Sequence, residues 1–70
     1  MISIERVNSL VKSLGGYDDS ELEKFSEIIL TSVQCAQEQI KDESQHSNPL
    51  VEMLAAAMAN YQLAIINMGD

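Results

Sequence analysis

The few helix-breaking residues of this chain stand at the borders of its apolar stretches rather than inside them. The only proline follows Asn48, and the three glycines occupy positions 15, 16 and 69. Between these borders, apolar residues recur every three or four positions, which is the spacing of one helix face. Because aromatic residues make up only 4% of the 70 residues, the sequence predicts helices rather than strands.

We expect three helices in a single domain that spans residues 1–70. The first covers about residues 4–14, with an apolar face of Ile4, Val7, Leu10, Val11 and Leu14. The second covers about residues 19–41, with an apolar face of Leu22, Phe25, Ile28, Ile29, Val33, Ala36 and Ile40. The third covers about residues 49–68. Helices of this length with one apolar face each predict an all-α three-helix bundle.

Residues with known capping preferences stand at each expected helix start. Ser3 and Asn48 are suited to the N-cap position, and Pro49 is suited to the first helical position, where its missing amide costs nothing. Asp18 and Glu21 are three positions apart, which is the spacing of a capping box. Gly15-Gly16 and Gly69 then follow as stops for the first and third helices.

The third helix carries two apolar rows, and this is its most informative property. A full-length row is expected to face the core: Leu50, Val51, Leu54, Met58, Tyr61, Ile65 and Met68. A second row lies on nearly the opposite side: Ala56, Ala59, Leu63 and Ile66. A helix with two apolar faces is either enclosed by its own fold or shared with another chain. The second row is therefore a candidate subunit interface, unless the first two helices cover it.

No residue pattern indicates catalysis or metal binding. Ser20 follows an aspartate, as does the modified serine of acyl carrier proteins, but the flanking sequence does not fit that family, and a helix start explains the segment. Cys35 is expected to be a small buried hydrophobe, and His46 lies in the polar segment 42–47, where a solvated side chain is expected. The sequence therefore predicts a protein that is not an enzyme and that holds no cofactor or metal.

The charge pattern disfavours nucleic acid and membranes as partners. Net charge is −7, and the four basic residues are scattered along the chain: Arg6, Lys12, Lys24 and Lys41. Phosphate backbones and anionic lipid surfaces are bound by clustered basic residues. The apolar stretch 49–68 is interrupted by polar residues, so we interpret it as a buried helix rather than a membrane span. No signal peptide is apparent near the start, and a cytoplasmic location is expected.

In their order along the chain, these elements resemble the small helical head–tail connector (adaptor) proteins of tailed phages and prophages. The resemblance rests on "IERVNSLVKSLG", on "YDDSE" opening "LEKFSEIILTSVQCAQEQI", on the polar loop with proline, and on "LVEMLAAAMANYQLAII". It implies a non-enzymatic subunit without cofactor that assembles as a ring and contacts the portal or other head and tail proteins. The resemblance therefore implies that the protein forms a homo-oligomer and is cytoplasmic or virion-associated.

An alternative reading uses the acidic surface instead of the apolar row. Glu23, Glu27 and Glu38 fall on the polar face of the second expected helix. A small acidic regulatory module of the anti-activator or inhibitor type would direct such a face toward a basic surface on its partner.

Overall fold

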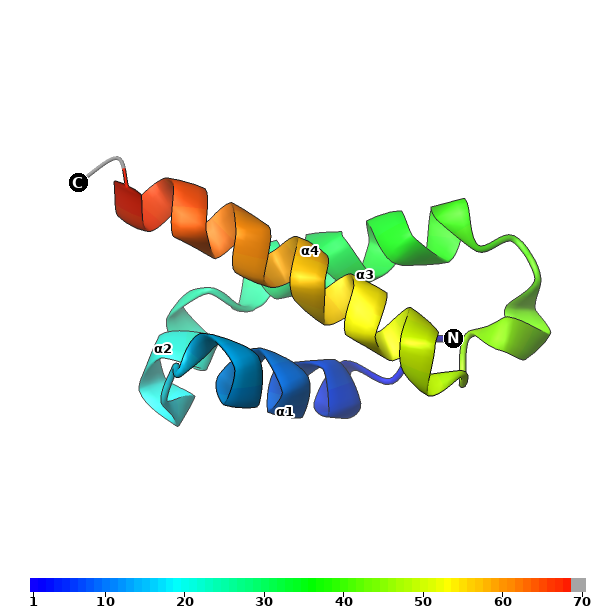
Figure 1. The fold of residues 1–70 in the computed structure, drawn as a ribbon, viewed down its shortest axis with the longest axis horizontal. Helices are drawn as coiled ribbons and strands as arrows, with labels where there is room; N and C mark the ends of the chain where they lie inside the picture. Colours follow the sequence, from blue (N-terminus) through cyan, green and yellow to red (C-terminus); the bar gives the residue numbers. More distant parts are fainter. Residues whose placement is uncertain (69–70) are drawn as a thin grey trace.

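The computed structural model describes residues 1–68, with side chains up to residue 67. In this range the chain is all-α, with four α-helices, one short 3-10 turn and no strand. The α-helices are α1 (Ile4–Gly15), α2 (Asp19–Lys24), α3 (Ser26–Gln39) and α4 (Pro49–Met68), and the 3-10 turn η1 spans Glu43–Gln45. Figure 1 shows α4 crossing the molecule from the η1 end to the opposite end.

The second expected helix is wrong in one respect, because it is broken into α2 and α3 at Phe25. The Phe25 backbone leaves the helical region at φ −103° and ψ 19°, and its N–H bonds to the carbonyls of Glu21 and Glu23. The bend brings the Phe25 ring edge-to-face against Tyr17, with ring centroids 6.5 Å apart. Neither glycine nor proline stands at this break, which coincides with the aromatic contact between Phe25 and Tyr17. Helix α3 also ends earlier than expected, at Gln39.

The expected helix starts are confirmed by their hydrogen bonds. The Ser3 hydroxyl accepts from the Arg6 N–H at the start of α1. Asp18 and Glu21 form the complete capping box of α2. At α4 the Asn48 side chain accepts from the Leu50 N–H at 2.9 Å, with Pro49 in the first helical position. The sequence pattern therefore located these starts correctly.

Gly15-Gly16 ends α1, as expected. Gly16 adopts the left-handed conformation, with φ 71° and ψ 21°, and donates its N–H to the Lys12 carbonyl. This conformation is sterically unfavourable for residues with a Cβ atom, and glycine adopts it freely because it has none. At Gly15 a Cβ would stand 2.5 Å from the Asn60 side chain, so glycine here permits close contact between α1 and α4. The stop expected at Gly69 lies outside the described residues.

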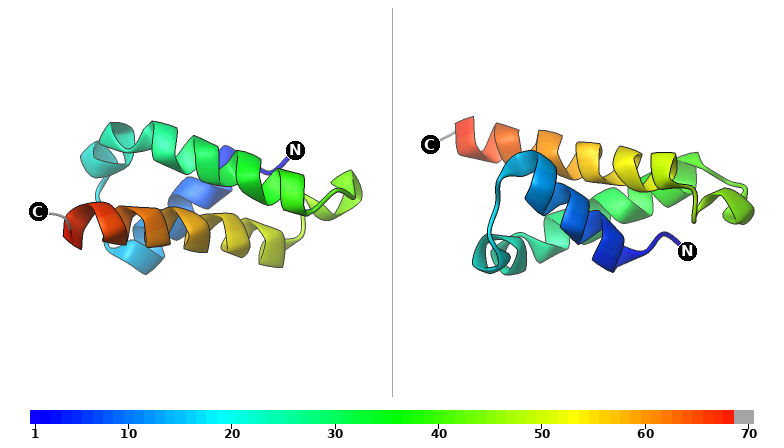
Figure 2. Two further views of the ribbon diagram at one scale, coloured as in Figure 1. Left: turned by 90° about the horizontal axis from the view of Figure 1, so that it is seen from above. Right: turned by 60° about the horizontal axis from the view of Figure 1, so that its bottom comes forward.

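The core sits where α1 and α3 both pack against α4. Figure 2 shows α3 and α4 running side by side along the long axis, with α1 crossing them. Most of the bulky core side chains come from Ile2, α1 and α3, and one comes from α4: Ile2, Val7, Val11, Ile29, Val33 and Leu63. Helix α4 contributes mostly alanines, which let its backbone approach both neighbours closely.

The fold also encloses His46, contrary to the expectation of a solvated histidine. Its side chain is only 6% exposed, and its Nε2 lies 2.6 Å from the Ile40 carbonyl oxygen. Because that oxygen can only accept, Nε2 carries the proton and donates it. The buried Nδ1 has no protein partner. His46 therefore ties the segment between α3 and α4 to the end of α3.

Candidate interaction surface on α4

The two apolar rows of α4 occupy the reverse of their expected positions. The buried face of the helix is Val51, Glu52, Ala55, Ala56, Ala59 and Leu63. Ala56, Ala59 and Leu63 were expected at a subunit interface, and this is a correction, because all three are enclosed by the chain itself. Of that row only Ile66 is accessible, at 42%. The alternative in which α1 and α3 cover this row therefore holds for three of its four members.

The row expected in the core lies largely on the surface. Leu50 is 71% exposed, Tyr61 66% and Ile65 48%, whereas Leu54 and Met58 are half-buried and only Val51 is buried. The Met68 side chain lies outside the described residues. The error has a physical cause, since both rows are apolar and the larger side chains were assigned to the core. In the structure, the row that contains the alanines faces α1 and α3, because small side chains allow the helices to pack closely.

An apolar surface without charge follows from this reversal. We define the outer face of α4 by eight of the nine solvent-facing or half-buried apolar residues among positions 49–67, leaving out Ile66, which lies on another side of the helix. The eight are Leu50, Met53, Leu54, Ala57, Met58, Tyr61, Ala64 and Ile65. The only charged residue in α4 is Glu52, which is buried on the other side. Contiguous apolar patches of several hundred Å² on a folded chain mark interaction sites. The outer face is therefore the candidate functional site.

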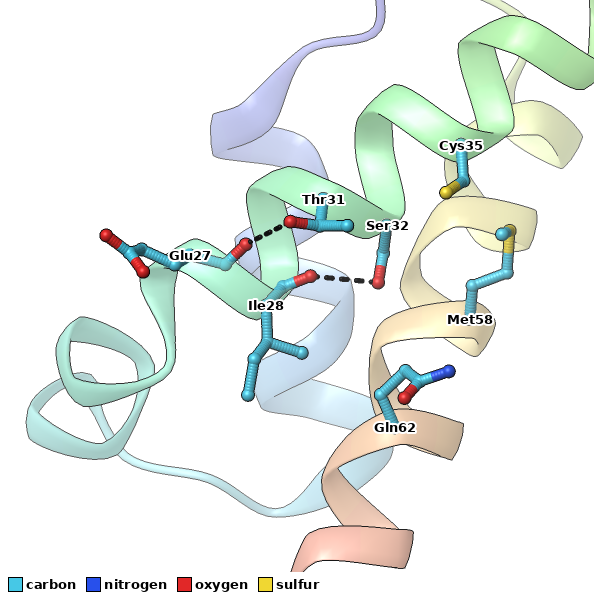
Figure 3. A pocket seen from close by; sticks show the side chains of 7 residues that line it. All are labelled: Glu27, Ile28, Thr31, Ser32, Cys35, Met58 and Gln62. Atoms are coloured by element: carbon cyan, nitrogen blue, oxygen red, sulfur yellow. Dashed lines mark hydrogen bonds between the residues drawn. The ribbon is translucent and has the colours of Figure 1, made fainter.

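A groove runs between α3 and α4 beside this face. It has a volume of about 410 Å³ and is lined by Glu27, Ile28, Thr31, Ser32, Cys35, Met58 and Gln62. Figure 3 shows Cys35 lying across the groove from Met58, and the Glu27 carboxylate pointing away from both. Cys35 is thus half-buried at a groove wall rather than enclosed in the core.

The hydroxyl groups of the groove are bonded within their own helix. Thr31 Oγ1 donates to the Glu27 carbonyl at 2.9 Å, and Ser32 Oγ donates to the Ile28 carbonyl at 3.0 Å. A nucleophilic hydroxyl requires an adjacent general base, and these protons are directed to backbone carbonyls. Among residues 1–68 no group of three or more His, Cys, Asp or Glu side chains is placed to hold a metal ion. The groove can accept an apolar side chain from a partner.

One buried ion pair connects α4 to α1. Arg6 Nε lies 2.9 Å from Glu52 Oε1, and the Glu52 side chain is 3% exposed while that of Arg6 is 66% exposed. A buried carboxylate needs a partner of this kind to remain charged without a large desolvation cost. Arg6 therefore stabilises the placement of α4 on α1, and with it the orientation of the outer face.

Helix α4 also meets the length and composition criteria for a membrane span. Its stretch Pro49–Asn67 has a mean hydropathy of 1.3, and one-third of it is buried inside the fold. A helix at the centre of a folded domain satisfies the same criteria. Here α4 packs on both α1 and α3. Its mean hydropathy is high because the face toward those helices and the face toward solvent are both apolar.

Two aspartates at helix starts have pKa values held below their usual 3.8. The Asp18 pKa is lowered by the Glu21 backbone N–H and then by the Ser20 hydroxyl, which donate to the carboxylate at 2.9 and 2.8 Å. The Asp42 pKa is lowered by the Ser44 hydroxyl and then by the Ser44 backbone N–H, at 2.7 and 3.0 Å. The Ser20 hydroxyl is thus engaged with the helix cap, in agreement with an architectural role for this segment.

These shifts predict a loss of stability in acid. A group whose pKa is lowered by folding stabilises the folded state above its unfolded pKa, and that contribution disappears as the pH falls through the folded pKa. Unfolding by urea, followed by circular dichroism, should show stability declining as the pH falls below about 4. Asp18→Asn keeps a capping side chain and should weaken this decline, whereas Glu23→Gln, outside the cap, should not. An identical acid profile for Asp18→Asn and the wild type would contradict the assignment.

No known family model, curated protein or solved structure matches this chain.

Proposed function

We propose that this protein is a non-enzymatic assembly protein that works by making protein–protein contacts through the outer face of α4. The observation that carries the proposal is that the outer face of α4 consists of eight apolar residues and contains no charged one, in a chain whose net charge is −7. Solvated helix faces are normally polar, since water favours charged side chains there. An apolar outer face is best accounted for by a partner that covers it.

In its specific form, the proposal is that the protein is a head–tail connector subunit of a tailed phage or prophage. The resemblance of the sequence to that family supports it. Such a subunit would self-associate and contact the portal or other head and tail proteins, first in the cytoplasm and later in the virion. Its fold would be a three-helix bundle in which α1 is the first helix, α2 and α3 together form the second, bent helix, and α4 is the third.

Self-association through the outer face can be tested by sedimentation velocity over a wide concentration range. The wild type is expected to form oligomers as its concentration rises. Tyr61→Lys should abolish them, because a charge would be placed in the middle of the face. Leu14→Lys is the matched control, since Leu14 is exposed on α1 and is not one of the residues of the outer face, and this variant should associate like the wild type.

The residue chosen for this test follows from the burial of α4. A charge at Leu63 would enter the core and unfold the chain, so loss of association there would carry no information about an interface. Tyr61 is 66% exposed, so Tyr61→Lys should retain the helical circular dichroism of the wild type. Association that persists in folded Tyr61→Lys would contradict the proposal.

An acidic regulatory module remains a second proposal, and the exposure of its residues supports it. Glu23, Glu27 and Glu38 are all exposed, on α2 and α3. A complex formed by these carboxylates with a basic partner would weaken steeply as salt is added, because solvent-exposed charges are screened. A complex formed by the outer face of α4 would persist, since apolar contacts are not screened.

A further inference from the structure

The outer face of α4 contains a seam with the spacing of a coiled coil. Leu50, Leu54, Ala57, Tyr61 and Ala64 follow one another at intervals of 4, 3, 4 and 3 residues. Four of them are exposed, and Leu54 is half-buried. A repeat of alternating threes and fours keeps one line of side chains facing a second helix along the whole contact. The seam therefore fits a helix of similar length as its partner.

The sizes of the seam residues are complementary to a second copy of α4 in the opposite direction. In an antiparallel pair centred level with residue 59, Tyr61 of each copy lies beside Ala57 of the other. In the same arrangement Leu54 lies beside Ala64 of the other copy. Both of these layers combine one large and one small side chain, and such alternation fills the space between helices evenly.

A parallel pair of the same helices would pack badly. It would place Tyr61 beside Tyr61, and Ala57 beside Ala57, so that crowded layers alternate with empty ones. Both overpacking and voids are destabilising. Antiparallel helices also bring opposite ends of their macrodipoles together, which is favourable.

The electrostatics of the chain also favour a second copy over a charged partner. The acidic residues that give the chain its net charge lie outside the seam, and the seam itself holds no charge that could steer a basic protein. The net charge of −7 would be repelled by an anionic lipid surface, and it also opposes the approach of a second copy, so the pair depends on the uncharged seam. At about 1.5 Å per residue α4 is about 30 Å long, so the pair belongs with small interfaces that bury less than roughly 1,200 Å² in total. Association should therefore be concentration-dependent and reversible.

We propose that the outer face of α4 is covered by the same face of a second copy, in an antiparallel pair about a two-fold axis level with residue 59. This inference rests on the proposed function in its general form, which is assembly through the outer face of α4, because it names the partner of the same surface. A two-fold pair differs from the ring that the resemblance to connector proteins implies. A two-fold contact uses the same patch on both copies and closes on itself, so the pair is a dimer.

Disulfide trapping distinguishes the direction of the pair. Cys35 is the only cysteine, so Cys35→Ser provides a background without thiols, into which Leu54→Cys and Ala64→Cys are placed separately. In the antiparallel pair, position 54 of one copy faces position 64 of the other, and a mixture of the two variants should oxidise to a mixed disulfide dimer. Two residues at position 54 would be separated by about 15 Å along the axis, beyond the roughly 7 Å that a disulfide spans, so neither variant alone should form a disulfide-linked dimer.

Each other outcome overturns the two-fold pair in a recognisable way. Rapid oxidation of Leu54→Cys alone would indicate a parallel pair, and a wild type that sediments as a series beyond the dimer would indicate a head-to-tail contact. Both results would leave the proposed assembly function standing. A wild type that remains monomeric at every concentration would overturn self-association as well. If that monomer pelleted with phosphatidylcholine vesicles while Tyr61→Lys did not, the outer face would be a lipid contact instead.

Discussion

Leu63→Ala is expected to lower the free energy of unfolding by about 3 kcal/mol, within the range for leucines truncated in a packed core. Leu63 is fully buried and belongs to the same cluster as Val11, Ile29 and Val33. Chains of this size rarely gain more than about 3–5 kcal/mol from a single core. The variant should therefore be largely unfolded in urea concentrations that leave the wild type folded, as measured by circular dichroism.

The matched control is Leu14→Ala, the same substitution at a residue that is 61% exposed. It should change the free energy of unfolding by less than about 1 kcal/mol, since little apolar surface is lost from the interior. Equal losses for the two variants would mean that Leu63 is not enclosed as the structure shows. In that case the row Ala56, Ala59, Leu63 and Ile66 would again become a candidate for the subunit interface.

Arg6→Ala is expected to cost about 2 kcal/mol, because it leaves the Glu52 carboxylate buried without its partner. The cost should be below that of breaking a fully buried pair, since the Arg6 side chain is itself largely exposed. Urea unfolding at neutral pH provides the measurement. Lys12→Ala is the matched control, because the Lys12–Asp19 pair has the same 2.9 Å separation but is exposed at both ends, and exposed pairs contribute little.

A double-mutant cycle separates the ion pair from the loss of the Arg6 side chain. Glu52→Gln removes the charge and keeps the volume, so Arg6→Ala in that background should cost clearly less than in the wild type. If the two costs are equal, Arg6 stabilises the protein through packing alone. The cycle would then show that the orientation of α4 on α1 does not depend on this charge pair.

The sequence was sufficient to predict the parts of the fold that depend on local physics. Ser3, Asp18 with Glu21, and Asn48 with Pro49 start their helices as expected, because a cap is decided by a few neighbouring residues. The break at Phe25 could not be predicted in the same way. It coincides with an aromatic contact with Tyr17 across a turn, and no glycine or proline marks it.

The row predicted as a subunit interface lies on the buried side of α4, except for Ile66, and the exposed apolar residues lie largely on the opposite side. The unusual number of apolar residues in α4 predicted that this helix has two apolar faces. Which row faces the core, however, is decided by how closely α1 and α3 approach α4, and periodicity carries no information on that distance. The alanines at positions 55, 56 and 59 together with Gly15 were the available signal, because small residues indicate close contact between helices.

His46 was misplaced for a related reason. A polar segment predicts solvated side chains on average, but one imidazole there donates to the Ile40 carbonyl and is covered by the fold. Such a bond depends on the path of the five intervening residues, which composition does not specify.

The packing of α1 has a consequence for the order in which the helices can become stable. Helix α1 packs mainly against α4 and only slightly against α3, so residues 1–48 contain no complete core of their own. Helix α1 is therefore expected to remain largely unpacked until α4 has been synthesised and can cover it.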